Sequence, residues 1–181
     1  MKVSNTYKEI IRGFEGKKLD SKGFHIAYNK GDKNTIGYGN TFYENGDTVK
    51  IGDRISENRA RELFFNVLES FARSVYNLLK KSVSQNQFDS LVSLAYNIGI
   101  PSFKASTLLK KANINPNDAT IKSEFTKWVF ATLNGVKTKL DGLETRRKLE
   151  ASNYFTGSTK NGLIITIIII IITFFILKTS K

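Results

Sequence analysis

The spacing of apolar residues changes at Ser56, and this change constrains the fold of the chain more than any other feature. Upstream, residues 24–28 and 34–39 have the composition of short strands, with a turn predicted at residues 30–33. Downstream, apolar residues recur at helical spacing: Leu63, Phe64, Val67, Leu68, Phe71, Val75 and Leu78. This pattern predicts an α+β fold in which a small β-hairpin sheet precedes a mostly helical domain.

Further helices are predicted on both sides of these segments. Residues 1–16 have an amphipathic helical pattern, with Tyr7, Ile10, Ile11 and Phe14 on one face, and not the pattern of a signal peptide. Ser84 and Gln87 form a capping box that opens another helix, which Gly99 and Pro101 are expected to end. Three more elements are indicated by local pattern: a turn at residues 45–46 and helices at residues 121–129 and 143–154.

The last twenty residues differ from the rest of the chain. Residues 163–177 contain only Leu, Ile, Phe and two Thr. As a helix they would span about 22 Å, against a hydrocarbon core of about 30 Å, and flanking lysines can reach the interface. We expect a C-terminal transmembrane tail anchor at 163–177, a flexible linker at 156–162 and a folded domain at 1–155; a buried core helix or strand is the alternative for the tail.

Composition limits the chemistry that the chain can perform. It has no cysteine and a single histidine, His25, which excludes disulfides and zinc sites built from several histidines. We therefore expect no cofactor, and hydrolytic chemistry would come from carboxylates, hydroxyls or lysines. The net charge of +12 favours polyanionic partners, among them nucleic acid, anionic lipid and the bacterial cell wall.

Glu15 is the first candidate catalytic residue. It follows the apolar face of the N-terminal helix and precedes Gly16, so its carboxyl is expected at a helix C-terminus near apolar side chains. The helix dipole and desolvation would both disfavour the charged form there, which suits a general acid. A surface glutamate at a helix end has the same local pattern.

Gly37 and Gly39 flank Tyr38 in the second predicted strand, where glycine permits close approach of another chain or a ligand. Thr35 is expected on the face opposite Ile36, either as a functional hydroxyl or as an ordinary strand residue.

Taken together, these segments resemble the phage-type lysozymes of glycoside hydrolase family 24, the endolysins of many bacteriophages. The resemblance covers roughly residues 5–155. Its motifs occur in the family's order: Phe14-Glu15-Gly16, Thr35-Ile36-Gly37-Tyr38-Gly39-Asn40-Thr41, residues 85–93, 95–99 and 106–109, and Gly142-Leu143-Glu144-Thr145-Arg146-Arg147 with Glu150. The two arginines are expected either to contact the wall or to pair with Glu144 or Glu150.

The resemblance implies hydrolysis of the β-1,4 bond between N-acetylmuramic acid and N-acetylglucosamine. It makes Glu15 the acid that protonates the leaving oxygen. It assigns to Thr35, together with an aspartate, the water that attacks the anomeric carbon, with inversion.

The aspartate is where this sequence departs from the family pattern. The matching position, two residues after Tyr28, is Lys30. Asp32 in the predicted turn is the preferred replacement. Asp20, in an extra segment, and Asn29, which can position water without a charge, are the alternatives.

The expected partners are peptidoglycan glycan strands and, through the tail, a lipid membrane; no nucleic acid is expected. The enzyme would act as a muramidase in host lysis or when a virus enters a bacterium, from a virion membrane or a host inner membrane. Two alternatives stay open, a membrane-anchored protein that binds peptidoglycan without cutting it and a lytic transglycosylase.

Overall fold

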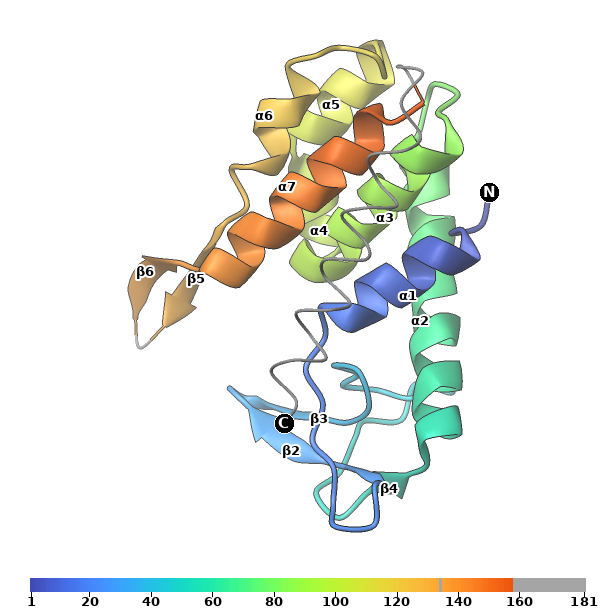
Figure 1. Ribbon diagram of the computed structural model, residues 1–181, viewed down its shortest axis with the longest axis vertical. Coiled ribbons are helices and arrows are strands. Elements are labelled where there is room, and N and C mark those ends of the chain that lie inside the picture. Colours follow the sequence, from blue (N-terminus) through green and yellow to red (C-terminus); the bar gives the residue numbers. More distant parts are fainter. Residues whose placement is uncertain (134, 158–181) are drawn as a thin grey trace. The chain divides into compact units, whose positions relative to one another are not determined.

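The computed structural model describes residues 1–133 and 135–157 (Figure 1). The described chain divides into two compact units. The first comprises Met1–Leu79 and Ala95–Ala105, and the second comprises Lys80–Leu94 and the described residues from Ser106 onward. Helix α3 (Gln85–Ile98) begins in the second unit and ends in the first.

The first unit combines helices with short strands, as predicted. Its elements are α1 (Asn5–Gly13), β1 (His25–Ile26), β2 (Tyr28–Lys30), β3 (Lys33–Thr35), β4 (Arg54–Ile55), α2 (Glu57–Leu78) and α4 (Ile100–Ala105). Helix α2 begins where the apolar spacing changes, because the Ser56 hydroxyl accepts a hydrogen bond from the backbone N–H of Arg59 at 3.2 Å.

The strands form two small antiparallel ladders in place of one continuous sheet. Strand β1 pairs with β4, and β2 pairs with β3 across the predicted turn, where Gly31 has a φ of +68°. The prediction of a strand over residues 34–39 is wrong beyond Thr35. Ile36 and Asn40 exchange backbone hydrogen bonds of 2.9 and 3.0 Å, which closes a turn over the residues between them.

A buried cluster holds the first unit together. Ile36, Val49, Leu63 and Val67 form its centre. Partly buried apolar side chains pack around that centre: Ala27, Tyr43, Ile55, Phe71 and Tyr96. The cluster therefore joins the turn after β3 to the apolar face of α2.

The second unit is mostly helical. Besides the start of α3, it contains α5 (Thr107–Ile114), α6 (Ile121–Phe125), β5 (Phe130–Leu133), β6 (Val136–Lys139) and α7 (Asp141–Phe155). The capping box is confirmed: Ser84 N–H donates to Gln87 Oε1 at 2.8 Å, and Gln87 N–H donates to Ser84 Oγ at 3.2 Å. The predicted end of the helix that starts at Ser84 is confirmed, because α3 ends at Ile98, directly before Gly99, and Pro101 lies in the first turn of α4. The helix predicted at residues 121–129 is too long, because α6 ends at Phe125, before the unpredicted β5–β6 hairpin.

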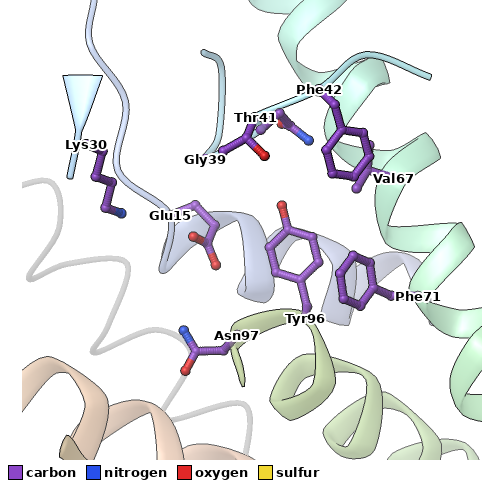
Figure 2. Close-up of a pocket in the computed structure, with 10 residues that line it drawn as sticks. Glu15, Lys30, Gly39, Thr41, Phe42, Val67, Phe71, Tyr96 and Asn97 are labelled. Atoms are coloured by element: carbon purple, nitrogen blue, oxygen red, sulfur yellow. The ribbon is translucent and has the colours of Figure 1, made fainter. Parts of the chain in front are cut away.

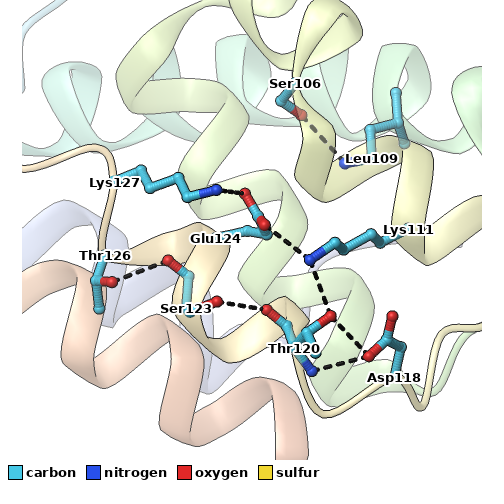
Figure 3. A network of polar contacts seen from close by, with 9 residues as sticks. All are labelled: Ser106, Leu109, Lys111, Asp118, Thr120, Ser123, Glu124, Thr126 and Lys127. Atoms are coloured by element: carbon cyan, nitrogen blue, oxygen red, sulfur yellow. Dashed lines mark hydrogen bonds and ion pairs between the residues drawn. The ribbon is translucent and has the colours of Figure 1, made fainter.

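Buried carboxylates form ion pairs within and between the helices of this unit. Glu124 of α6 is buried and accepts hydrogen bonds from Lys111 at 2.8 Å and Lys127 at 2.6 Å, which lower its pKa (Figure 3). The predicted pairing of the two arginines with Glu150 is also present, since Arg146 Nε lies 3.2 Å and Arg147 Nε 2.9 Å from its carboxylate.

Within residues 1–133 and 135–157, no helix is both long and apolar enough to cross a membrane. The predicted anchor at 163–177 lies outside the described residues, as does most of the predicted linker at 156–162.

Candidate active site

Glu15 lies immediately past the end of α1, as the sequence predicts. Phe14 is the C-cap, and its N–H donates to the carbonyl of Ile11 at 3.1 Å. The N–H of Glu15 donates to the carbonyl of Arg12, also at 3.1 Å. These bonds extend the last turn of the helix and fix the backbone that carries the carboxylate.

The Glu15 side chain lines a pocket of about 260 Å³ in the first unit. Figure 2 shows it reaching into the space between Lys30 and Tyr96. The remaining lining residues are Gly39, Asn40, Thr41, Phe42, Val67, Phe71 and Asn97. In the part of the chain that the structure describes, Glu15 is the one acidic residue that lines this pocket.

Gly39 lies close to the Glu15 carboxylate. A Cβ built on Gly39 would lie 3.2 Å from Glu15 Oε2, and Gly39 has a φ of +84°, which favours glycine. The close approach expected at this glycine is therefore an approach to Glu15 itself. The next residue, Asn40, is buried, and its carboxamide has no hydrogen-bond partner among the described residues.

Thr35 is buried and pairs with Tyr28 across the β2–β3 ladder, but it is not among the residues that line the pocket. Tyr28 interacts with Glu15 electrostatically. Its pKa is raised first by burial and then by the negative charge of Glu15. In the sequence, Tyr28 serves only to align Lys30 with the family aspartate, and its proximity to the Glu15 carboxylate is not predicted.

The three candidates for the family aspartate lie in different environments. The Asp20 carboxylate accepts backbone N–H groups from Lys22 and Phe24 and the side chain of Arg54 at 2.7 Å, and this last bond lowers its pKa. Asp32 is exposed at the β2–β3 turn, and Asn29 is exposed on β2. None of these three residues lines the pocket. Lys30, which the sequence resemblance aligns with the family aspartate, lines it instead.

A cluster of polar side chains beside the pocket was not predicted. Arg12 Nη1 donates to the hydroxyl of Tyr38 at 2.6 Å, and that hydroxyl donates to Glu57 Oε1. The fully buried ring of His25 contacts Glu57 Oε2 through Nε2 at 2.7 Å.

This arrangement shifts the pKa values of Tyr38 and Glu57. Burial, and then the hydrogen bond to Glu57, raises the pKa of Tyr38 to about 12. Burial alone would raise the pKa of Glu57, but the bonds from Tyr38 and His25 outweigh it and lower that pKa. No local pattern signals the cluster, because its four members come from four separate segments.

Known proteins share both the sequence and the fold. The Phage lysozyme family matches residues 14–150. An endolysin of Bacillus phage B103 is 37% identical over 161 residues, which cover 89% of this chain and 57% of that relative, so the chain spans little more than half of the relative's length. An endolysin of Acyrthosiphon pisum secondary endosymbiont phage 1 is 34% identical over 150 residues, which are 83% of this chain and 95% of the relative.

Solved structures of other proteins have a similar fold. An endolysin from Escherichia coli O157:H7 phage FAHEc1 superposes with a TM-score of 0.75 at 33% identity, covering 87% of this chain and 95% of that one. The muramidase domain of SpmX from Asticaccaulis excentricus gives a TM-score of 0.72 at 31% identity, covering 86% and 98%. The fold is lysozyme-like α+β, and the chain belongs to the phage lysozyme family.

Proposed function

We propose that this protein is a lysozyme-type glycoside hydrolase that cleaves peptidoglycan, at the β-1,4 bond between N-acetylmuramic acid and N-acetylglucosamine. The observation that carries the proposal is the placement of Glu15. Glu15 follows the last hydrogen-bonded turn of α1, and its carboxylate lies against Gly39 and lines the pocket. Membership in the phage lysozyme family supports the same chemistry, and the finer assignment to glycoside hydrolase family 24 is part of the proposal.

In the proposed mechanism, Glu15 protonates the glycosidic oxygen as the bond to the anomeric carbon breaks. Thr35 and a second polar group hold the water that attacks the opposite face of the sugar, and that water releases one proton, to the second group where it is a carboxylate or otherwise to solvent. Asp32 stays our preferred second group, with Asn29 as the alternative. Asp20 is the weakest candidate, because its carboxylate already accepts two backbone hydrogen bonds within its own loop and a third from the side chain of Arg54 on β4.

One observation favours a second candidate reaction. Glu15 is the one carboxylate lining the pocket among the described residues, and Lys30 occupies the place of the aspartate. A lytic transglycosylase needs an acid but no group to position water. In that reaction Glu15 protonates the leaving oxygen as the glycosidic bond breaks, and the C6 hydroxyl of the muramic acid then attacks its own anomeric carbon and gives its proton to the Glu15 carboxylate. A 1,6-anhydro ring forms in place of a reducing end.

Product analysis tests these alternatives. Purified peptidoglycan is digested, and the soluble fragments are separated by liquid chromatography and mass spectrometry. Reducing muramic acid ends support the muramidase, and 1,6-anhydro ends, lighter by one water, support the transglycosylase. If no fragment appears and the protein still sediments with the walls, the chain binds peptidoglycan without cutting it. Glu15→Gln is the matched control, since it keeps the side-chain shape and removes the acid.

We also propose that residues 163–177 anchor this domain to a membrane through the linker at 156–162. The support is the uncharged apolar run flanked by lysines. A relative described as a SAR-endolysin, from Enterobacteria phage P21, is 31% identical over 119 residues. The membrane would be that of a virion or the inner membrane of the host.

Flotation with lipid and resistance to alkaline carbonate test the anchor. A chain shortened to residue 160 should lose both properties and still cleave purified walls. Release of the full chain by carbonate alone would show that the tail does not lie in the bilayer.

A further inference from the structure

The turn that carries Gly39 depends on contacts outside itself for its shape. Two backbone hydrogen bonds between Ile36 and Asn40 close this turn. Within it, Gly37 and Gly39 have φ values of +62° and +84°. Glycine adopts many backbone conformations at similar energy, so these two residues do not restrict the turn to one shape. The residue between them, Tyr38, is only 2% exposed, and its side chain reaches two helices of the first unit.

Arg12 connects Tyr38 to the backbone that carries the proposed acid. The carbonyl of Arg12 accepts the N–H of Glu15 at 3.1 Å, and its guanidinium donates to the Tyr38 hydroxyl through Nη1 at 2.6 Å. The guanidinium also lies over the Tyr38 ring, 4.8 Å from the ring centroid. Glu9, one turn earlier in α1, accepts Arg12 Nε at 2.8 Å and so limits the rotation of the guanidinium. Arg12 therefore links the end of α1 to the turn.

The second partner of the Tyr38 hydroxyl lies in α2. The hydroxyl donates to Glu57 Oε1 in the first turn of that helix, where the helix dipole favours a negative charge. The other carboxylate oxygen of Glu57 contacts Nε2 of the fully buried His25 at 2.7 Å. The His25 ring lies 5.1 Å from the Tyr38 ring. The hydroxyl thus accepts a hydrogen bond from one helix and donates one to another, and its position is set from both sides.

The position of this turn affects the room available to the Glu15 carboxylate. Gly39 follows Tyr38 directly, and a Cβ built on Gly39 would stand 3.2 Å from Glu15 Oε2, so the turn lies against the carboxylate. If the turn moved away, the carboxylate would gain freedom to rotate away from its direction in the pocket. Misplacing a reacting group by about 1 Å can reduce a rate about 100-fold.

We propose that Tyr38 is a positioning residue for Glu15. Its hydroxyl, bonded to Arg12 and Glu57, holds the turn against the carboxylate, which keeps the direction in which it protonates the glycosidic oxygen. The inference rests on the proposed function, because that function makes Glu15 the acid. Tyr38 is not among the residues that line the pocket, so it acts through Glu15 and not by contact with the sugar.

The test compares two variants of the full chain that each lose one buried hydroxyl. Tyr38→Phe keeps the ring and removes both hydrogen bonds. Tyr154→Phe is the matched control, because Tyr154 is 1% exposed in the second unit and its hydroxyl donates to the carbonyl of Pro116 at 2.9 Å. Both variants should lower the melting temperature by about 3 °C.

The kinetic constants distinguish positioning from a structural role. Cleavage of solubilised glycan strands is followed by liquid chromatography of the fragments. Tyr38→Phe should lower kcat about tenfold and leave KM unchanged, because it disturbs the acid and not the binding of the strand. Tyr154→Phe should change neither constant.

A double-variant cycle tests whether Tyr38 acts through Arg12. Arg12→Gln should lower kcat about as much as Tyr38→Phe, and the variant that combines them should be no slower, because both substitutions break the same link. Arg59→Gln removes another arginine of the first unit, one that pairs with Glu44, and should leave kcat unchanged.

Backbone NMR relaxation gives a readout that does not depend on cleavage. The order parameter of the Gly39 amide should fall in Tyr38→Phe and in Arg12→Gln, because the turn moves more, and should stay as in the native chain in Tyr154→Phe and Arg59→Gln.

Equal kcat values for Tyr38→Phe and Tyr154→Phe would overturn the proposal, and so would an unchanged Gly39 order parameter. Losses in kcat that multiply in the double variant would overturn the link through Arg12. If Tyr38→Phe does not fold, Arg12→Gln decides by the same two measurements. If the native chain releases no fragments while the Gly39 order parameter changes as expected, the proposed function fails and the support of the turn by Tyr38 stands.

Discussion

The carboxylate of Glu15 lies against Gly39, so that a Cβ at residue 39 would stand 3.2 Å from Glu15 Oε2. A side chain at residue 39 would therefore crowd the carboxylate, which would have to shift by a few tenths of an ångström.

Gly39→Ala tests this relationship. The left-handed backbone of an alanine at residue 39 should cost about 1–3 kcal/mol of stability, and the new methyl group should displace the carboxylate and reduce kcat strongly. Gly23→Ala is the matched control, because Gly23 has a φ of +79° with nothing within 4 Å of its Cβ position. Gly23→Ala should lose stability but keep its kcat. Equal kcat losses in the two variants, measured as wall clearance, would contradict the role given to Gly39.

The water-positioning residues can be ranked by activity. Thr35→Ala should reduce wall clearance most, Asp32→Asn less, and Asp20→Asn least. Asp20→Asn should instead lower the melting temperature, because it weakens the bond to Arg54 that closes the loop. If Asp20→Asn proved the most damaging to kcat in protein that remains folded, the extra segment would belong to the active site.

The raised pKa of Tyr38 predicts that the protein loses stability in alkaline solution. Its pKa is raised from 10.0 to about 12 in the folded state, so the unfolded chain releases this proton at a lower pH than the folded one. The stabilisation is complete below pH 10 and is lost as the pH rises from 10 to 12. Urea unfolding across this window should show a smaller decline for Tyr38→Phe than for the native chain. Equal slopes for both proteins would show that Tyr38 is not the group responsible.

We expect removal of the Glu150 carboxylate to lower the stability of the fold strongly. Its buried carboxylate lies between Arg146 and Arg147 and accepts the Ser93 hydroxyl at 2.5 Å. Glu150→Ala would leave two buried guanidinium groups uncompensated, which typically costs about 3–5 kcal/mol. Glu144→Ala, which removes a partly exposed partner of Lys139 and Lys148, should change stability little. Denaturant midpoints distinguish the two variants, and similar midpoints would show that burial adds nothing to the Glu150 pairs.

Several features of this protein follow from local sequence alone. The end of α1 before Glu15, the start of α2 at Ser56, the capping box of Ser84 and Gln87, and the turn between β2 and β3 were all predictable. Each rests on hydrogen bonds between residues at most a few positions apart, so a short stretch of chain is enough to encode it. The order of motifs also indicated the family, which the comparisons confirm.

Tertiary structure decided the rest of the site. Residues 36–39 have a strand-like composition, yet Ile36 and Asn40 close a turn, and that turn carries Gly39 to Glu15. The local sequence leaves Asp20 available for chemistry, but in the structure its carboxylate is bonded to Arg54, 34 residues away.

The polar cluster of Arg12, Tyr38, Glu57 and His25 likewise joins side chains from distant segments. The physical reason is common to all of them. Burial and long-range hydrogen bonds depend on which segments the core brings together, and neither periodicity nor spacing within one segment contains that information.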